Sequence, residues 1–197
     1  MQNSAEQIVD QILVMDAQDG CREAFETLVS RWQKRLWWHA YHLSGHTEAA
    51  WDISQESWLS IVRGLGRLRD PARFGSWAYR IVSNKAYDWL CRNGRETSPE
   101  MDPVDMSSLA VEQRSHETDS DVHDILRRLP ARSQVVLNLY YLEGFGLAEI
   151  VQILGVPEGT VKSRLHTARI EFRKHWESPG ETSPAPVPAS GKERQHE

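Results

Sequence analysis

Residues 147–174 read LAEIVQILGVPEGTVKSRLHTARIEFRK, and this stretch decides the fold. Its apolar residues recur at three- and four-residue spacing in two sets, first Leu147, Ile150, Val151 and Leu154, then Val161, Leu165, Ala168 and Phe172. That spacing places each set on one face of a helix. Gly155 is suited to ending the first helix, and residues 156–159 suit a tight turn. The stretch therefore predicts two helices joined by a turn.

The second of these helices presents cations and short hydrogen-bonding side chains away from its apolar face. They are Thr160, Lys162, Ser163, Arg164, His166, Thr167 and Arg169. Residues 158–174 carry a local charge of +3 in a chain whose net charge is −5. A helix fits the major groove of DNA, where its N-terminal residues reach base edges and its cations meet phosphates. The pattern predicts a DNA-reading helix-turn-helix; the alternative is a helical hairpin with a solvated basic face.

The same helical spacing runs through the N-terminal half of the chain. It predicts helices from Ala24 to Leu43, from Thr47 to Leu65 and from Phe74 to Cys91, separated by Gly45 and by a turn at Asp70-Pro71. Short connections between three amphipathic helices predict one compact domain over residues 23–95. Residues 1–22 precede this domain as an N-terminal extension.

Composition changes after residue 95. Residues 96–120 scatter acidic side chains among Ser, Thr and Pro, which predicts a flexible acidic linker. Helical spacing resumes at Val122 and is interrupted at Pro130, so residues 121–177 predict a second domain that contains the helix-turn-helix. Residues 178–197 hold four prolines and predict a disordered tail. The predicted fold class is all-α: two small helical domains joined by a flexible acidic linker.

Several function classes are disfavoured by residue content. Cys21 and Cys91 lie far apart and form no metal-ligand spacing, so neither a disulfide framework nor a zinc finger is indicated and the reducing cytoplasm is favoured. The absence of a signal sequence and of a run of about eighteen apolar residues argues against secretion and membrane insertion. His39, His42 and His46 lack a carboxylate or thiolate partner, and no catalytic motif appears. We therefore expect no metal site, no cofactor and no catalytic residues.

The run GTVKSRL at residues 159–165 carries a family resemblance. Together with Glu149-Ile150 and Leu154-Gly155 before it and Ala168-Arg169 after it, the run resembles region four of bacterial extracytoplasmic-function sigma factors. The resemblance implies that the seven polar residues of the second helix bind the minus-thirty-five promoter element as duplex DNA. It also implies that this domain touches the flap of core RNA polymerase.

A second set of residues resembles region two of the same family. Gly45, Glu48 and Ala50 precede the run DISQE at residues 52–56, and Trp58 follows it. Asp52, Gln55 and Glu56 lie at i, i+3 and i+4 and so share one helix face. The resemblance implies that these three residues, with Leu59, dock on the clamp helices of core RNA polymerase. Trp51 departs from the family, which commonly has an acidic residue there.

Residues 73–84 read RFGSWAYRIVSN and resemble the part of region two that recognises and melts the minus-ten element. Aromatic faces can stack on unpaired bases, and arginines can hold a separated strand. The resemblance implies DNA contacts from Arg73, Phe74, Trp77, Arg80, Asn84, Lys85 and Asp88. The helical stripe offers Phe74 and Trp77 an alternative place in the core.

Taken together, these resemblances imply a sigma factor that binds core RNA polymerase, directs promoter-specific initiation and is restrained by an anti-sigma factor. Catalysis would then belong to the polymerase. The alternative is a stand-alone helix-turn-helix regulator with an N-terminal dimerisation or sensor domain. Such a regulator needs neither the acidic face at Asp52 nor the aromatic and basic segment at residues 73–84, so these two features favour the sigma factor.

Overall fold

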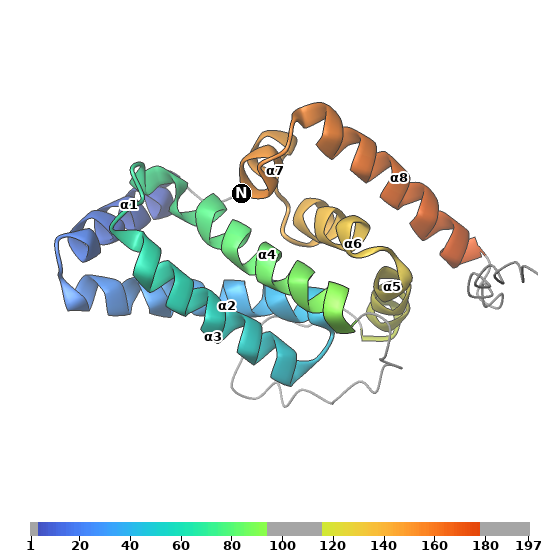
Figure 1. Cartoon of the computed structure of the whole chain (residues 1–197), viewed down its shortest axis with the longest axis horizontal. Helices are drawn as coiled ribbons and strands as arrows, with labels where there is room; N and C mark the ends of the chain where they lie inside the picture. The colour runs from blue at the N-terminus through green and yellow to red at the C-terminus, as the bar shows by residue number, and fades with distance from the viewer. Residues whose placement is uncertain (1–3, 94–115, 178–197) are drawn as a thin grey trace, which may run out of the picture.

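The computed structural model describes residues 4–93 and 116–177, and Figure 1 shows their arrangement. The first domain consists of α1 (Ser4–Gln18), α2 (Arg22–Ser44), α3 (Thr47–Leu65), the short 3-10 helix η1 (Pro71–Arg73) and α4 (Phe74–Asn93). The second consists of α5 (His116–Arg128), α6 (Ala131–Leu137), the π-helical turn η3 (Asn138–Leu142), α7 (Leu147–Leu154) and α8 (Glu158–Glu177). These two ranges contain no strand, which confirms the predicted all-α fold class.

Helices α2, α3 and α4 form the first domain at the positions that the periodicity predicts. Gly45 ends α2 because it adopts a left-handed backbone with φ of 72°, and its N–H donates to the carbonyl oxygen of Tyr41. The apolar faces meet in a core that includes Leu28, Leu36 and Ile61. Burial of these faces, rather than helix propensity, holds the three helices together.

The N-terminal extension expected over residues 1–22 is itself largely a helix, α1, that packs along α2. Val14 of α1 is fully buried, and the carboxylate of Asp10, also on α1, pairs with Arg31 of α2 at 2.7 Å. The side-chain amide of Gln18 donates to the carbonyl oxygens of Leu65 and Leu68 at 2.8 Å each, which ties the end of α1 to the end of α3. The extension is therefore part of the first domain.

The helix-turn-helix follows the predicted boundaries closely. Gly155 ends α7 with φ of 65°, and its N–H donates to the carbonyl oxygen of Val151 at 2.9 Å. Helix α8 begins at Glu158, two residues before the predicted start at Thr160. Helix α5 begins at His116, inside the segment expected as linker. The remainder of that segment and the predicted tail lie outside the described residues.

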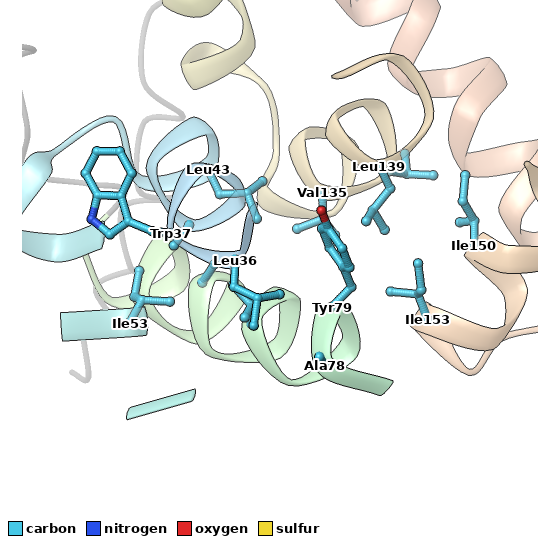
Figure 2. Close-up of a cluster of buried hydrophobic side chains, with 14 of the residues drawn as sticks. Leu36, Trp37, Leu43, Ile53, Ala78, Tyr79, Val135, Leu139, Ile150 and Ile153 are labelled. Atoms are coloured by element: carbon cyan, nitrogen blue, oxygen red, sulfur yellow. The ribbon is translucent and has the colours of Figure 1, made fainter. Parts of the chain in front are cut away.

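The two domains pack against each other through α4. One side of α4 contacts α2 and α3, and another contacts α6 and α7 (Figure 1). Figure 2 shows Tyr79 of α4 between Leu36 of the first domain and Val135 and Ile153 of the second. Buried residues of both domains consequently form one continuous apolar cluster. Among the helices of the two described ranges, none is long and apolar enough to cross a lipid bilayer.

Candidate polymerase and DNA surfaces

A groove between α2 and α3 is lined by two of the four residues predicted to bind polymerase. Gln55 and Leu59 line this groove, which has a volume of about 710 Å³. Its apolar wall is made mainly by Phe25, Val29, Trp37, Trp51, Trp58 and Val62. Trp51 is 50% exposed and Leu59 is 56% exposed, so much of this wall faces solvent. We call it the tryptophan groove.

Trp51 belongs to this surface, although its motif marks it only as a departure from the family. Its indole ring lies 5.5 Å from the ring of Trp37 at the edge of the tryptophan groove. Residues 51, 55, 58, 59 and 62 are spaced at three and four along α3, which is the signal that places them on one face. Contiguous exposed apolar surface of this kind marks interaction sites.

The other two predicted polymerase contacts, Asp52 and Glu56, lie on a neighbouring strip of α3. They line a separate charged groove, of about 260 Å³, with Lys85, Asp88 and Arg92 of α4. The Nζ atom of Lys85 lies 3.0 Å from Oε2 of Glu56. A residue predicted to bind polymerase and a residue predicted to bind DNA thus form an ion pair with each other.

The aromatic residues predicted to contact the minus-ten element are placed by packing. Phe74 is 1% exposed, and its ring meets that of Trp32 edge to face at 5.3 Å. Phe74 has almost no surface to offer a base in this arrangement, which favours the core alternative for its ring. Trp77 is half-buried beside Phe74, at 6.1 Å between ring centroids, and keeps part of its ring exposed.

The polar minus-ten candidates point in different directions. Arg73 is exposed and pairs with Asp70 at 3.1 Å. The guanidinium of Arg80 lies against Gly155, at the turn between α7 and α8, where an added Cβ would come within 2.9 Å of its Nη2. Lys85 and Asp88 line the charged groove described above. The fifth candidate, Asn84, faces the second domain.

Asn84 and Arg164 line one cleft between the domains. Tyr87 of α4 and Arg132 of α6 also line this cleft, whose volume is about 220 Å³. The Nε of Arg132 donates to the hydroxyl of Tyr87 at 3.4 Å across it. We call this space the interdomain cleft. It brings together one residue predicted to contact the minus-ten element and one predicted to contact the minus-thirty-five element.

The predicted reading face of α8 lies largely in solvent. Lys162, Ser163, His166, Thr167 and Arg169 are exposed, and Thr160 and Arg164 are half-buried. Lys162 pairs with Glu158 at 2.7 Å, one turn before it, and this pairing lowers the pKa of Glu158. The guanidinium of Arg169 stacks over the rings of Tyr140 and Tyr141, at 5.4 and 5.5 Å. The seven residues form a continuous polar strip.

A buried polar network that the sequence does not reveal joins the two domains at His39. The ring of His39 is fully buried, and its Nδ1 lies 2.8 Å from Oδ1 of Asn138 and 3.2 Å from Oε1 of Glu143. Both oxygens accept, so Nδ1 donates, and in the neutral ring Nε2 accepts from the hydroxyl of Ser83 at 2.9 Å. The hydroxyl of Tyr79 donates to Oε2 of Glu143 at 2.8 Å. Within the described ranges no cluster of His, Cys, Asp and Glu is arranged to hold a metal.

The charge state of Glu143 follows from these contacts. Burial by itself would raise the pKa of Glu143, but the hydrogen bonds from His39 and Tyr79, with the ring of His42 3.9 Å away, outweigh it and lower the pKa to about 2. Burial, together with the neighbouring carboxylate, raises the pKa of Tyr79 well above its ordinary range. Near neutral pH the network therefore holds an ionised Glu143 and a neutral Tyr79.

Known protein families match both domains of the chain. The family models for Sigma-70 region 2 and Sigma-70, region 4 match residues 28–96 and residues 120–171. An ECF RNA polymerase sigma-E factor from Haemophilus influenzae is 31% identical over 179 residues, which cover 84% of this chain and 94% of that protein. The RNA polymerase sigma-H factor of Pseudomonas aeruginosa is 29% identical over 174 residues, covering 81% and 90% of the two chains.

Solved structures show the same fold. The chain resembles CnrH, solved in complex with the cytosolic domain of CnrY, with a TM-score of 0.66 and 24% identity over 87% of this chain and 99% of that one. It also resembles the sigma factor RpoE of Bartonella quintana, solved with the anti-sigma factor NepR, with a TM-score of 0.62 and 21% identity over 78% and 96%. The chain belongs to the extracytoplasmic-function (ECF) sigma factors, the subunits that direct RNA polymerase to promoters.

Proposed function

We propose a division of labour between the two domains of this sigma factor. The first domain docks on core RNA polymerase through the tryptophan groove and the adjacent acidic strip of α3, and contacts the minus-ten element through α4. The second domain binds the minus-thirty-five element through the polar strip of α8. The observation that carries the proposal is the exposed tryptophan groove beside Asp52 and Glu56, because contiguous exposed apolar surface with a charged rim marks a site for a protein partner.

The tryptophan groove has the chemistry of a helix-docking site. An amphipathic helix buries its apolar residues in such a groove, and the rim charges select its partner and orientation. Trp51, Trp58 and Leu59 supply the apolar wall, while Asp52 and Glu56 supply negative charge along one edge. The expected occupant is therefore a helical part of polymerase that carries basic side chains, which fits its clamp helices.

The DNA-binding part of the proposal rests on local charge and shape. The α8 strip combines cations with Ser, Thr and His side chains on the first turns of a helix, where base edges come within reach. Among the minus-ten candidates, Arg73 of η1 and Arg80, Asn84 and Asp88 of α4 are exposed, and Trp77 is half-buried. Cations and an aromatic face suit a separated strand better than a duplex.

The proposal extends to regulation and location. The structural relative from Bartonella quintana was solved with an anti-sigma factor, and we propose that an anti-sigma factor restrains this chain as well. Its free thiols, Cys21 and Cys91, suit the cytoplasm, where polymerase acts. In this proposal the chain positions DNA and polymerase, and the bond-forming chemistry belongs to the polymerase.

Charge reversal on α3 tests the docking surface. The double variant Asp52→Lys, Glu56→Lys should bind core polymerase at least tenfold more weakly, because it places two cations against a basic partner. Binding of the full chain to duplex DNA should not weaken. Asp19→Lys, an exposed reversal outside both grooves, is the control. Equal loss of polymerase and DNA binding would contradict the division of labour.

Salt dependence tests the α8 strip. Arg164→Ala and Arg169→Ala should each weaken duplex DNA binding and make the plot of log affinity against log salt shallower by about 0.9, the value for one lost phosphate contact. Arg22→Ala removes an exposed cation from α2 and should leave the slope unchanged. An unchanged slope in both α8 variants would place the DNA surface elsewhere. The measurement is DNA affinity of the full chain over a salt series.

A further inference from the structure

The side chain of Glu143 belongs to the second domain but is held by the first. It is 13% exposed, and the groups that contact its carboxylate are His39 and His42 of α2 and Tyr79 of α4. Oε1 lies 3.2 Å from His39 and 3.9 Å from His42, and Oε2 accepts from Tyr79 at 2.8 Å. We call these three residues the socket. A buried carboxylate is costly unless it is paired in this way, so the contact specifies one arrangement of the domains.

The backbone places Glu143 to enter the socket. The turn η3 is a π-helix, and the N–H of Glu143 donates to the carbonyl oxygen of Asn138, five residues earlier. This wider turn carries an extra residue and directs Asn138 and Glu143 to the same histidine. π-turns inside helices recur at functional sites. The backbone thus departs from regular α-helical geometry at the point where Glu143 contacts the first domain.

Further contacts on both sides of the socket keep the domains together. The ring of Phe145 meets Tyr79 edge to face at 4.7 Å. The guanidinium of Arg127, on α5, donates to the carbonyl oxygen of Gly45 at 3.2 Å, at the C-terminal end of α2. The Glu143 contact therefore lies within an interface of both apolar and polar character.

This packed arrangement does not suit simultaneous binding of two promoter elements. The minus-ten and minus-thirty-five elements are about 25 base pairs apart, or about 85 Å along B-form DNA. Asn84 and Arg164, one candidate for each element, instead line the same interdomain cleft. Arg80, another minus-ten candidate, lies against the turn of the helix-turn-helix. The two domains must separate before both sets of residues can be used on one promoter.

We propose that the described arrangement is a closed resting state, held by insertion of Glu143 into the socket, and that it opens before the chain engages a promoter. The inference rests on the division of labour proposed above. It adds a specific autoinhibitory contact: Glu143 of the second domain acts as a latch on α2 and α4 of the first. The 22 residues between Asn93 and His116 are long enough to let the domains move tens of ångströms apart.

Single-molecule energy transfer tests the latch without DNA or polymerase. Cys21 and Cys91 are replaced by Ser, and dyes are attached through Glu48→Cys in the first domain and Lys174→Cys in the second, both at exposed positions. Glu143→Ala should raise the population with separated dyes about tenfold, and Tyr79→Phe should raise it less, since it removes only the hydroxyl. Glu177→Ala, an exposed control, should leave it unchanged. Identical distributions of dye separation in the labelled parent chain and in its three variants would overturn the latch.

Reversible cross-linking tests whether the closed state is inactive. Tyr87→Cys and Arg132→Cys, which face each other across the interdomain cleft, are joined by a thiol-cleavable bis-maleimide in the chain lacking its native cysteines. The linked chain should support at least tenfold less core-dependent transcription from fragments of its own genome, and cleavage of the linker should restore it. Full activity of the linked chain would overturn the inference alone. Failure of the unlinked chain to initiate at all would overturn the proposed function, while energy transfer still decides the latch.

Discussion

Helices α4 and α8 have the same length, 20 residues each, and each carries residues predicted to bind DNA. They differ in how many of their sides are packed against other helices. Helix α4 lies between the two domains and buries seven residues along several directions. Helix α8 lies at the edge of the second domain and buries Val161, Leu165 and Ala168 on one side. A helix with one packed side keeps a whole face for a ligand, whereas a helix packed on several sides keeps only fragments.

The difference changes how a family motif transfers to each helix. On α8 the predicted residues form one strip, since the apolar stripe at 161, 165 and 168 leaves the intervening positions outward. On α4 the predicted residues are distributed among the core, the interdomain cleft and the charged groove. A motif names residues by position along the helix, and packing decides which of them remain accessible.

The largest effect is expected from Phe74→Ala on α4. Removing a ring that is buried against Trp32 should reduce the free energy of unfolding by about 3–5 kcal/mol, through lost burial and a cavity. Trp176→Ala on α8 removes a half-exposed ring and should cost about 0.5 kcal/mol. Urea denaturation measures both. A loss below about 1 kcal/mol for Phe74→Ala would place its ring outside the core and remove the contrast between the helices.

The fold could be predicted because its signals are local. Amphipathic spacing within single helices predicts most helix ends to within two or three residues of their places in the structure. Gly45 and Gly155, which adopt a left-handed backbone, mark two of these ends. The sequence does not predict α1 as a packed element, because Ile8, Val9, Ile12, Leu13 and Val14 do not form a single stripe. Three of these side chains, Ile8, Val9 and Ile12, remain substantially exposed, so the sequence does not show which side packs on α2.

The candidate site was predictable only where its residues are neighbours in sequence. Asp52, Gln55 and Glu56 were expected on one face, and all three are exposed, but adjacent helices divide them between two grooves. The contact between His39 and Glu143 spans 104 residues, and no local pattern encodes such a pairing. The sequence around Glu143 predicts only a helix end at Gly144, since a π-turn has no distinct hydrophobic period.

The second largest effect is a pH dependence that should separate the buried carboxylate of Glu143 from the exposed one of Glu158 on α8. The folded-state pKa of Glu143 is lowered to about 2 from 4.5, so its ionised form stabilises the folded chain above pH 4.5. This stabilisation, on the order of 3 kcal/mol, should disappear as the pH falls from about 4.5 toward 2. His39, His42 and Tyr79 face the carboxylate and remain in place in the variants.

The measurement is the unfolding free energy of the native chain, Glu143→Gln and Glu158→Gln at pH values from 7 to 3. Glu143→Gln should be less stable than the native chain at pH 7, and the difference should narrow with acid. Glu158→Gln should follow the native curve, because Glu158 and its partner Lys162 are both solvent-exposed. A constant difference between native and Glu143→Gln across this range would contradict the ionised latch.

The smallest effect is expected from the ion pair that joins α3 to α4. Glu56 is largely exposed, so Glu56→Gln should change the unfolding free energy by less than about 1 kcal/mol, and by less still at high salt. The pair must nevertheless break if Glu56 is to meet polymerase and Lys85 is to meet DNA. Glu56→Gln should therefore weaken polymerase binding while stability barely changes. If Glu56→Gln lowered the unfolding free energy by more than about 2 kcal/mol, Glu56 would be a structural residue. The acidic strip of α3 would then not be free to bind a partner, in contrast to the polar strip of α8.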